Sequence, residues 1–130
     1  RFCTEYLKPG APVAFVDFAL ARPESRMRCG FDGCLPGAPR LASDYIRILR
    51  DSGFSTSDVV DETRLFLPLI ARGWTGWRRA YAAATARTDV RSRAEAVRYL
   101  GDYAALWADR FEALKAGGLQ VVRLLARKIG

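Results

Sequence analysis

The spacing of hydrophobic positions changes several times along this chain, and each change indicates a new element. Residues 13–18, Val-Ala-Phe-Val-Asp-Phe, are an almost continuous apolar run without alternation of apolar and polar positions. Such a run is typical of a parallel strand that is covered on both faces. Pro9-Gly10 just before it favours a turn and would end a helix over residues 2–7. The pattern therefore predicts a buried strand that follows a helix.

After a stretch rich in proline and glycine, the spacing becomes helical. Apolar residues recur three and four positions apart, on a face made of Leu41, Tyr45, Ile48 and Leu49. Gly53 is placed to end this helix in a left-handed conformation, with Phe54 as its hydrophobic contact. Residues 55–63, with two valines at their centre, then predict a short strand.

The second half of the chain predicts mostly helix. Two helical stretches cover residues 65–72 and 74–86, and the second has Trp74, Trp77, Tyr81 and Ala84 at core spacing. Ser92-Arg93-Ala94-Glu95 matches a capping box. A longer helix would follow, with an apolar face made of Val97, Leu100, Ala104, Trp107, Phe111 and Leu114. Gly117-Gly118 ends it, and residues 119–126 predict a last strand.

This order of strands and helices predicts an α/β sheet, not a helical bundle. With 130 residues, the chain has the length of a single domain, residues 1–130. Residues 22–40 are punctuated by proline and glycine and predict a long loop. A loop of this length inside a compact domain is either a lid or binding segment, or disordered, and the sequence leaves both open.

Composition argues against several function classes. The net charge is +7, but the arginines are spread along the chain and form no basic stripe interleaved with aromatic residues, so a nucleic-acid partner is the weaker hypothesis. No apolar run of about 18 residues could cross a membrane. Residues 1–10 lack the order of a secretory signal, and the chain opens on arginine, which favours a trimmed or partial sequence.

The cysteines and the absence of histidine limit the chemistry further. Cys29 and Cys34 have no second pair and no histidine to complete a zinc site, so no metal is expected. Together with Cys3 they are interpreted as small apolar residues of a reducing cytoplasm, which predicts a cytoplasmic location. Without histidine, the chain cannot form a Ser-His-Asp or Cys-His nucleophile system.

Three segments carry a resemblance to class I S-adenosylmethionine-dependent methyltransferases. Residues 5–17, Glu-Tyr-Leu-Lys-Pro-Gly-Ala-Pro-Val-Ala-Phe-Val-Asp, resemble the segment entering the fifth strand of that family, which usually reads Leu-Lys-Pro-Gly-Gly; Ala11 replaces the second glycine. Residues 43–54 resemble the helix before the sixth strand. Residues 58–63, followed by Phe66, are similar to the corresponding stretch of phosphoethanolamine N-methyltransferases and related small-molecule enzymes.

The resemblance implies the C-terminal half of a Rossmann-like methyltransferase sheet, strands five to seven, with helices inserted at about 64–116. The first four strands and the cofactor glycine loop are outside that half, so S-adenosylmethionine is implied by resemblance only. The implied acceptor is a small amine, phosphobase, thiol or related nucleophile. The implied partner is an N-terminal half or a second copy in a dimer.

Three residues are candidates for binding the acceptor, and no catalytic residue is expected because methyl transfer depends mainly on positioning. Asp17, near the end of the first strand, could orient an amine or hydroxyl, or merely cap the next turn. Tyr45 matches a substrate-site tyrosine of the phosphoethanolamine group, or is a core residue. Arg110 matches a basic residue near the substrate phosphate in that group, or lies on a solvated helix face. The loop arginines Arg26, Arg28 and Arg40 could close over an anionic substrate.

A non-catalytic alternative also follows from the resemblance. Without a fourth strand, the strand at 13–18 would have an exposed apolar edge that could pair with another chain. The chain would then be a methyltransferase-like partner or dimerisation module.

Overall fold

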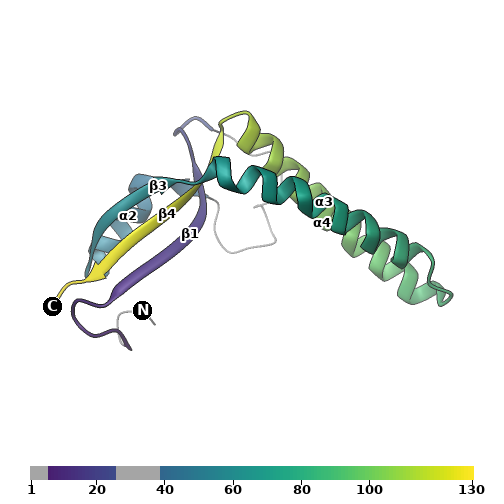
Figure 1. Cartoon of the computed structure of the whole chain (residues 1–130), viewed down its shortest axis with the longest axis horizontal. Helices are drawn as coiled ribbons and strands as arrows, with labels where there is room; N and C mark the ends of the chain where they lie inside the picture. Colours follow the sequence, from purple (N-terminus) through teal and green to yellow (C-terminus); the bar gives the residue numbers. More distant parts are fainter. Residues whose placement is uncertain (1–5, 26–38) are drawn as a thin grey trace.

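The computed structural model describes residues 6–25 and 39–130. The elements in chain order are β1 (Pro12–Leu20), β2 (Arg40–Leu41), α2 (Ala42–Asp51), β3 (Phe54–Asp61), α3 (Thr63–Thr85), α4 (Val90–Lys115) and β4 (Leu119–Lys128). The strands form one sheet in the order β2-β1-β4-β3. The predicted α/β class is confirmed, with the helical segment between β3 and β4 (Figure 1). Most of the helix predicted over 2–7, all three cysteines, Arg26 and Arg28 lie outside the described residues.

The strand pairing corrects one prediction. β4 lies between β1 and β3 and is antiparallel to both, whereas β1 is parallel only to the two-residue β2. Along most of its length, β1 is therefore not the parallel strand covered on both faces that its apolar run predicted. Ala14 and Val16 are exposed, because the α3–α4 hairpin packs only against the C-terminal end of this face of β1.

Each face of the sheet has its own hydrophobic cluster. On one face, Phe15, Ala19, Val122 and Leu124 pack against the α2 residues Ala42, Tyr45, Ile46 and Leu49. On the other, Phe18, Leu20, Leu119 and Val121 pack against the start of α3 and the end of α4, including Phe66 and Leu114. The central strand β4 contributes to both clusters, so it holds the two layers of helices together.

The predicted end of α2 is confirmed, but two predicted members of its apolar face do not belong to it, because Leu41 lies in β2 before the helix begins and Ile48 is exposed. Gly53 has a φ of 81° and its N–H donates to the Arg50 carbonyl at 3.0 Å, while Phe54 is buried. A position with this left-handed backbone conformation favours glycine, because glycine has no Cβ. Ile48 is 41% exposed, and Ile46 takes its place in the core.

The helical hairpin differs from its prediction in two details. The stretches 65–72 and 74–86 form one continuous helix, α3, which contains Pro68. Ser92 is not the N-cap of α4. The helix begins three residues earlier than the capping box indicated, and Asp89 caps it by accepting from the Ser92 N–H at 2.7 Å. Aspartate is as good a cap as serine, and the polar run before the box concealed it.

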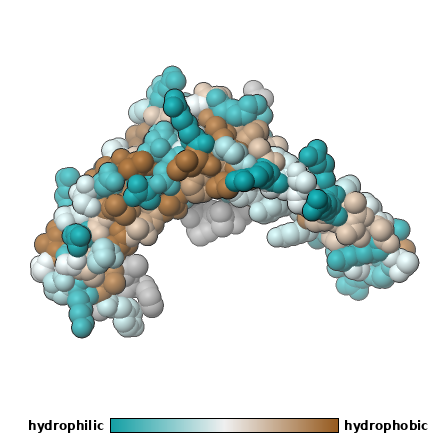
Figure 2. All heavy atoms as spheres, in the orientation of Figure 1, coloured by the Kyte–Doolittle hydropathy of each residue, from teal (hydrophilic) through white to brown (hydrophobic). Residues whose placement is uncertain are grey.

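The hairpin of α3 and α4 projects away from the sheet (Figure 1). The Trp77 indole joins the two helices, since its Nε1–H donates to the Leu100 carbonyl at 2.8 Å. In Figure 2, hydrophobic side chains gather over the sheet and the root of the hairpin. None of the helices in the described part of the chain is long and apolar enough to span a membrane.

Candidate functional site

The three candidate residues meet around one residue, Phe18, near the C-terminal end of β1. The Tyr45 hydroxyl donates a hydrogen bond to the Phe18 carbonyl oxygen at 3.1 Å. The Arg110 guanidinium lies over the Phe18 ring, 5.4 Å from its centroid. Asp17 directly precedes Phe18 and accepts a hydrogen bond from its backbone N–H at 2.7 Å.

The position of this cluster follows from the pleat of β1. Successive side chains of a strand point to opposite faces, so Asp17 and Phe18 face different layers. The cluster that contains Tyr45 lies on one face, and Phe18 belongs to the cluster of the hairpin on the other. The end of β1 is therefore where α2 and α4 both approach the same strand.

Burial and charge set the ionisation of two members. Burial, and next the negative charge of Asp17, raise the pKa of Tyr45 above its ordinary value, so the phenol keeps its proton at neutral pH. Burial lowers the pKa of Arg110, while the charges of Tyr103 and Asp17 oppose that effect. An arginine still keeps its charge at neutral pH. The cluster thus combines an exposed carboxylate, a neutral phenol and a buried cation.

These contacts bear on the alternative interpretations of each residue. Arg110 is only 5% exposed and does not lie on a solvated helix face; its guanidinium also lies 5.1 Å from the centroid of Trp107. Such geometry is a cation–π interaction. The ring of Tyr45 belongs to the core and packs edge-on against Phe15 at 6.5 Å, while its hydroxyl reaches the end of β1.

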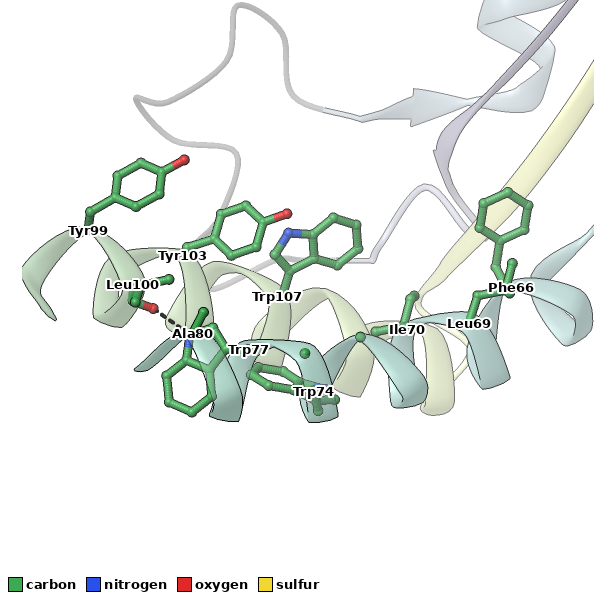
Figure 3. A pocket seen from close by; sticks show the side chains of 12 residues that line it. Phe66, Leu69, Ile70, Trp74, Trp77, Ala80, Tyr99, Leu100, Tyr103 and Trp107 are labelled. Carbon is green, nitrogen blue, oxygen red and sulfur yellow. Dashed lines mark hydrogen bonds between the residues drawn. The ribbon is translucent and has the colours of Figure 1, made fainter. Parts of the chain in front are cut away.

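A groove adjoins this cluster along the helical hairpin (Figure 3). It has a volume of about 560 Å³ and is lined by Phe66, Leu69, Ile70, Gly73, Trp74, Gly76, Trp77, Ala80, Tyr99, Leu100, Tyr103 and Trp107. None of these residues is charged. Tyr99 and Tyr103 were not singled out from the sequence. They lie eight and four residues before Trp107, a spacing that places all three on one side of α4.

The described residues contain no glycine-rich loop of the kind that holds a nucleotide cofactor. The left-handed glycines Gly10, Gly53 and Gly117 belong to separate turns and do not form a glycine-rich loop. No group of three or more His, Cys, Asp or Glu side chains in residues 6–25 and 39–130 could hold a metal ion. The cluster around Phe18 instead fits a small molecule that carries an amine or an anionic group, because it offers both a carboxylate and a guanidinium.

The sequence matches no protein-family model and none of the curated proteins. Several solved structures are similar. The chain aligns with phosphoethanolamine N-methyltransferase 2 of Haemonchus contortus, in complex with phosphomonomethylethanolamine and S-adenosylhomocysteine, at 13% identity and a TM-score of 0.62. A putative sarcosine dimethylglycine methyltransferase of Galdieria sulphuraria aligns at 16% identity and a TM-score of 0.67, and the [4+2]-cyclase SpnF at 21% and 0.53.

The alignments cover almost all of this chain and less than half of each neighbour. They include 98% of this chain in every case, and 28%, 45% and 42% of the three neighbours in the order given. The expected methyltransferase-like fold is confirmed, while the assignment of the strands as five to seven stays a prediction. The chain shares its fold with a part of two methyltransferases, one of which was solved with S-adenosylhomocysteine.

Proposed function

We propose that this chain is the acceptor side of an enzyme that transfers a methyl group from S-adenosylmethionine to a small-molecule nucleophile. The observation that carries the proposal is the meeting of Asp17, Tyr45 and Arg110 around Phe18, in a fold shared with a methyltransferase solved with a phosphorylated amine. Residues 1–130 would form one domain of a cytoplasmic protein. An N-terminal half or a second chain would complete the cofactor site.

Methyl transfer requires these residues to position an acceptor more than to exchange protons. Bound S-adenosylmethionine would supply an electrophilic methyl group. The exposed Asp17 carboxylate can accept a hydrogen bond from an amine or hydroxyl and hold it in place. The Tyr45 hydroxyl donates to the Phe18 carbonyl and also interacts with the Arg40 backbone and the Asp17 carboxylate, so it holds the end of β1 and Asp17 in position. Arg110 places a positive charge beside this point, which suits a phosphate or carboxylate of the acceptor.

The test measures cofactor and acceptor binding separately on the protein at its natural length. S-Adenosylhomocysteine binding is followed by calorimetry, and transfer of a labelled methyl group is measured on a panel of small amines, phosphobases and thiols. Asp17→Asn should raise the KM for the acceptor by about tenfold or more, because a hydrogen bond to a charged group is lost. Its affinity for S-adenosylhomocysteine should not change.

Asp102→Asn is the matched control, because Asp102 is an exposed aspartate of α4 that does not line the groove. It should leave the KM unchanged. A folded natural-length protein that binds no S-adenosylhomocysteine would refute the proposed function. An equal change of the acceptor KM in the two variants would show that Asp17 does not belong to the acceptor site.

The second candidate is a non-catalytic pairing module, and the edge of β1 favours it. In the described part of the chain, residues 12–18 pair with β4 on one side only, and β2 covers just Ala19 and Leu20 on the other. Open edges of this length are templates for pairing with another strand. This function predicts a dimer in sedimentation that Val16→Lys dissociates, without S-adenosylhomocysteine binding.

A further inference from the structure

Four aromatic rings form a row from the open end of the groove to the candidate site. Tyr99 and Tyr103 stack with centroids 6.3 Å apart and an interplanar angle of 16°. The ring centroids of Tyr103 and Trp107 are 6.1 Å apart, and those of Trp107 and Phe18 are 6.0 Å apart in an edge-to-face arrangement. Figure 3 shows Tyr99, Tyr103 and Trp107 side by side along α4. The row ends at the residue around which Asp17, Tyr45 and Arg110 gather.

The outer part of this row is not covered by the described residues. Tyr99 is 68% exposed and Tyr103 is 46% exposed. Binding of a ligand that removes such apolar surface from water is favourable in free energy. The volume of about 560 Å³ lies in the range of small-molecule sites, which are mostly apolar with a few polar groups at one end.

The chemistry of the lining selects the ligand. Among residues 6–25 and 39–130, no charged residue lines the groove, so this lining offers no charged partner to a phosphate chain or an acidic peptide. Aromatic side chains bind flat rings by offset stacking or edge-to-face contact. Arg110 and Asp17 place a positive and a negative charge at the Phe18 end, so a molecule that matches the described residues has a flat apolar body and one polar end.

We propose that the groove binds the body of the methyl acceptor, and that this body is an aromatic ring system with a short arm that carries the nucleophile. The ring system packs against Tyr103 and Trp107, and its arm points to the end of β1. This inference rests on the proposed function and narrows its acceptor to arylalkyl amines and close analogues.

The test compares two amines that differ only in the ring. The probes are 2-(2-naphthyl)ethylamine and ethylamine, titrated by calorimetry into the natural-length protein saturated with S-adenosylhomocysteine. The naphthyl amine should bind about tenfold or more tightly, because it alone fills the groove. Tyr103→Ala should weaken its binding about 3- to 10-fold through loss of one ring contact and leave ethylamine binding unchanged.

Leu65→Ala is the matched control, because Leu65 is a 67% exposed apolar residue of the same hairpin that does not line the groove. It should change neither affinity. Tyr99→Ala, at the more exposed position, gives a second variant if Tyr103→Ala fails to fold.

Either of two affinity results would overturn the acceptor inference while S-adenosylhomocysteine binding upholds the proposed function. One is equal affinity for the two amines, and the other is a naphthyl affinity that neither tyrosine variant changes. A dimer that Tyr103→Ala dissociates would also overturn it, since the groove would then bind a second copy. If S-adenosylhomocysteine does not bind but the naphthyl amine binds in a Tyr103-dependent manner, the groove is a ligand site and the proposed function fails.

Discussion

Replacing Tyr45 with phenylalanine tests the link between α2 and the end of β1. The substitution keeps the ring that packs against Phe15 and removes only the hydroxyl that donates to the Phe18 carbonyl at 3.1 Å. A hydrogen bond of this kind contributes about 0.5–1.5 kcal/mol net. Tyr45→Phe should therefore lower the free energy of unfolding by about 1 kcal/mol at pH 7.

The pH dependence of this difference has a definite sign. Because the folded-state pKa of Tyr45 is raised by burial and by Asp17, the folded protein holds the phenol proton more tightly than the unfolded chain. The stabilisation is fully present below the unfolded pKa of about 10, and it is lost as the pH rises from there through the folded pKa. The steepest slope for one proton is about 1.4 kcal/mol per pH unit. The wild type should thus lose its advantage over Tyr45→Phe above pH 10.

The assay is urea unfolding of both proteins between pH 7 and 11, followed by circular dichroism. Other tyrosines and lysines titrate in both proteins, so the difference between the two curves isolates Tyr45. Tyr99→Phe is the control, since the Tyr99 ring is 68% exposed, and it should change the stability by less than about 0.5 kcal/mol. Equal stability at pH 7, or a difference that does not shrink above pH 10, would refute the reasoning.

Two further predictions concern the scaffold and use thermal or urea unfolding. Leu124→Ala should destabilise the protein by about 3–5 kcal/mol, because Leu124 is fully buried in the central strand; a loss under 1 kcal/mol would show that β4 is not the centre of the core. Gly53→Ala should cost about 1–2 kcal/mol, because its φ is 81°. Gly101→Ala, in α4 with open space around it, should instead stabilise by about 0.5–1 kcal/mol. Equal effects of the two alanines would contradict the left-handed turn.

Much of the fold follows from local signals in the sequence. The order of the three longer strands and of the helical segments, the left-handed glycine after α2 and the apolar face of α4 were predicted, because each depends on the chain's own periodicity and end signals, whereas the two-residue β2 was not. The covered faces of β1 were predicted wrongly. An apolar run reports what a strand could bury, and it does not report how far along the strand a distant hairpin extends.

The candidate site was only partly predictable for the same reason. Asp17, Tyr45 and Arg110 were all singled out from position or resemblance, but the burial of Arg110 against two rings depends on where α4 meets the sheet. The aromatic row was missed because Tyr99 and Tyr103 look like ordinary members of an amphipathic helix. The row becomes apparent only when Phe18, from β1, extends it beyond Trp107.

The comparison with solved structures limits what the fold can say about the reaction. Two neighbours are named as methyltransferases and the third, at a TM-score of 0.53, is named as a [4+2]-cyclase, so this arrangement of sheet and helices does not specify one chemistry. The reaction must then be argued from side chains. Around Phe18, an exposed carboxylate, a phenol that keeps its proton and a buried guanidinium suit a polar group at the end of an aromatic groove. That pairing of a polar end with an apolar body is what separates an acceptor site from a sheet edge that merely pairs with another chain.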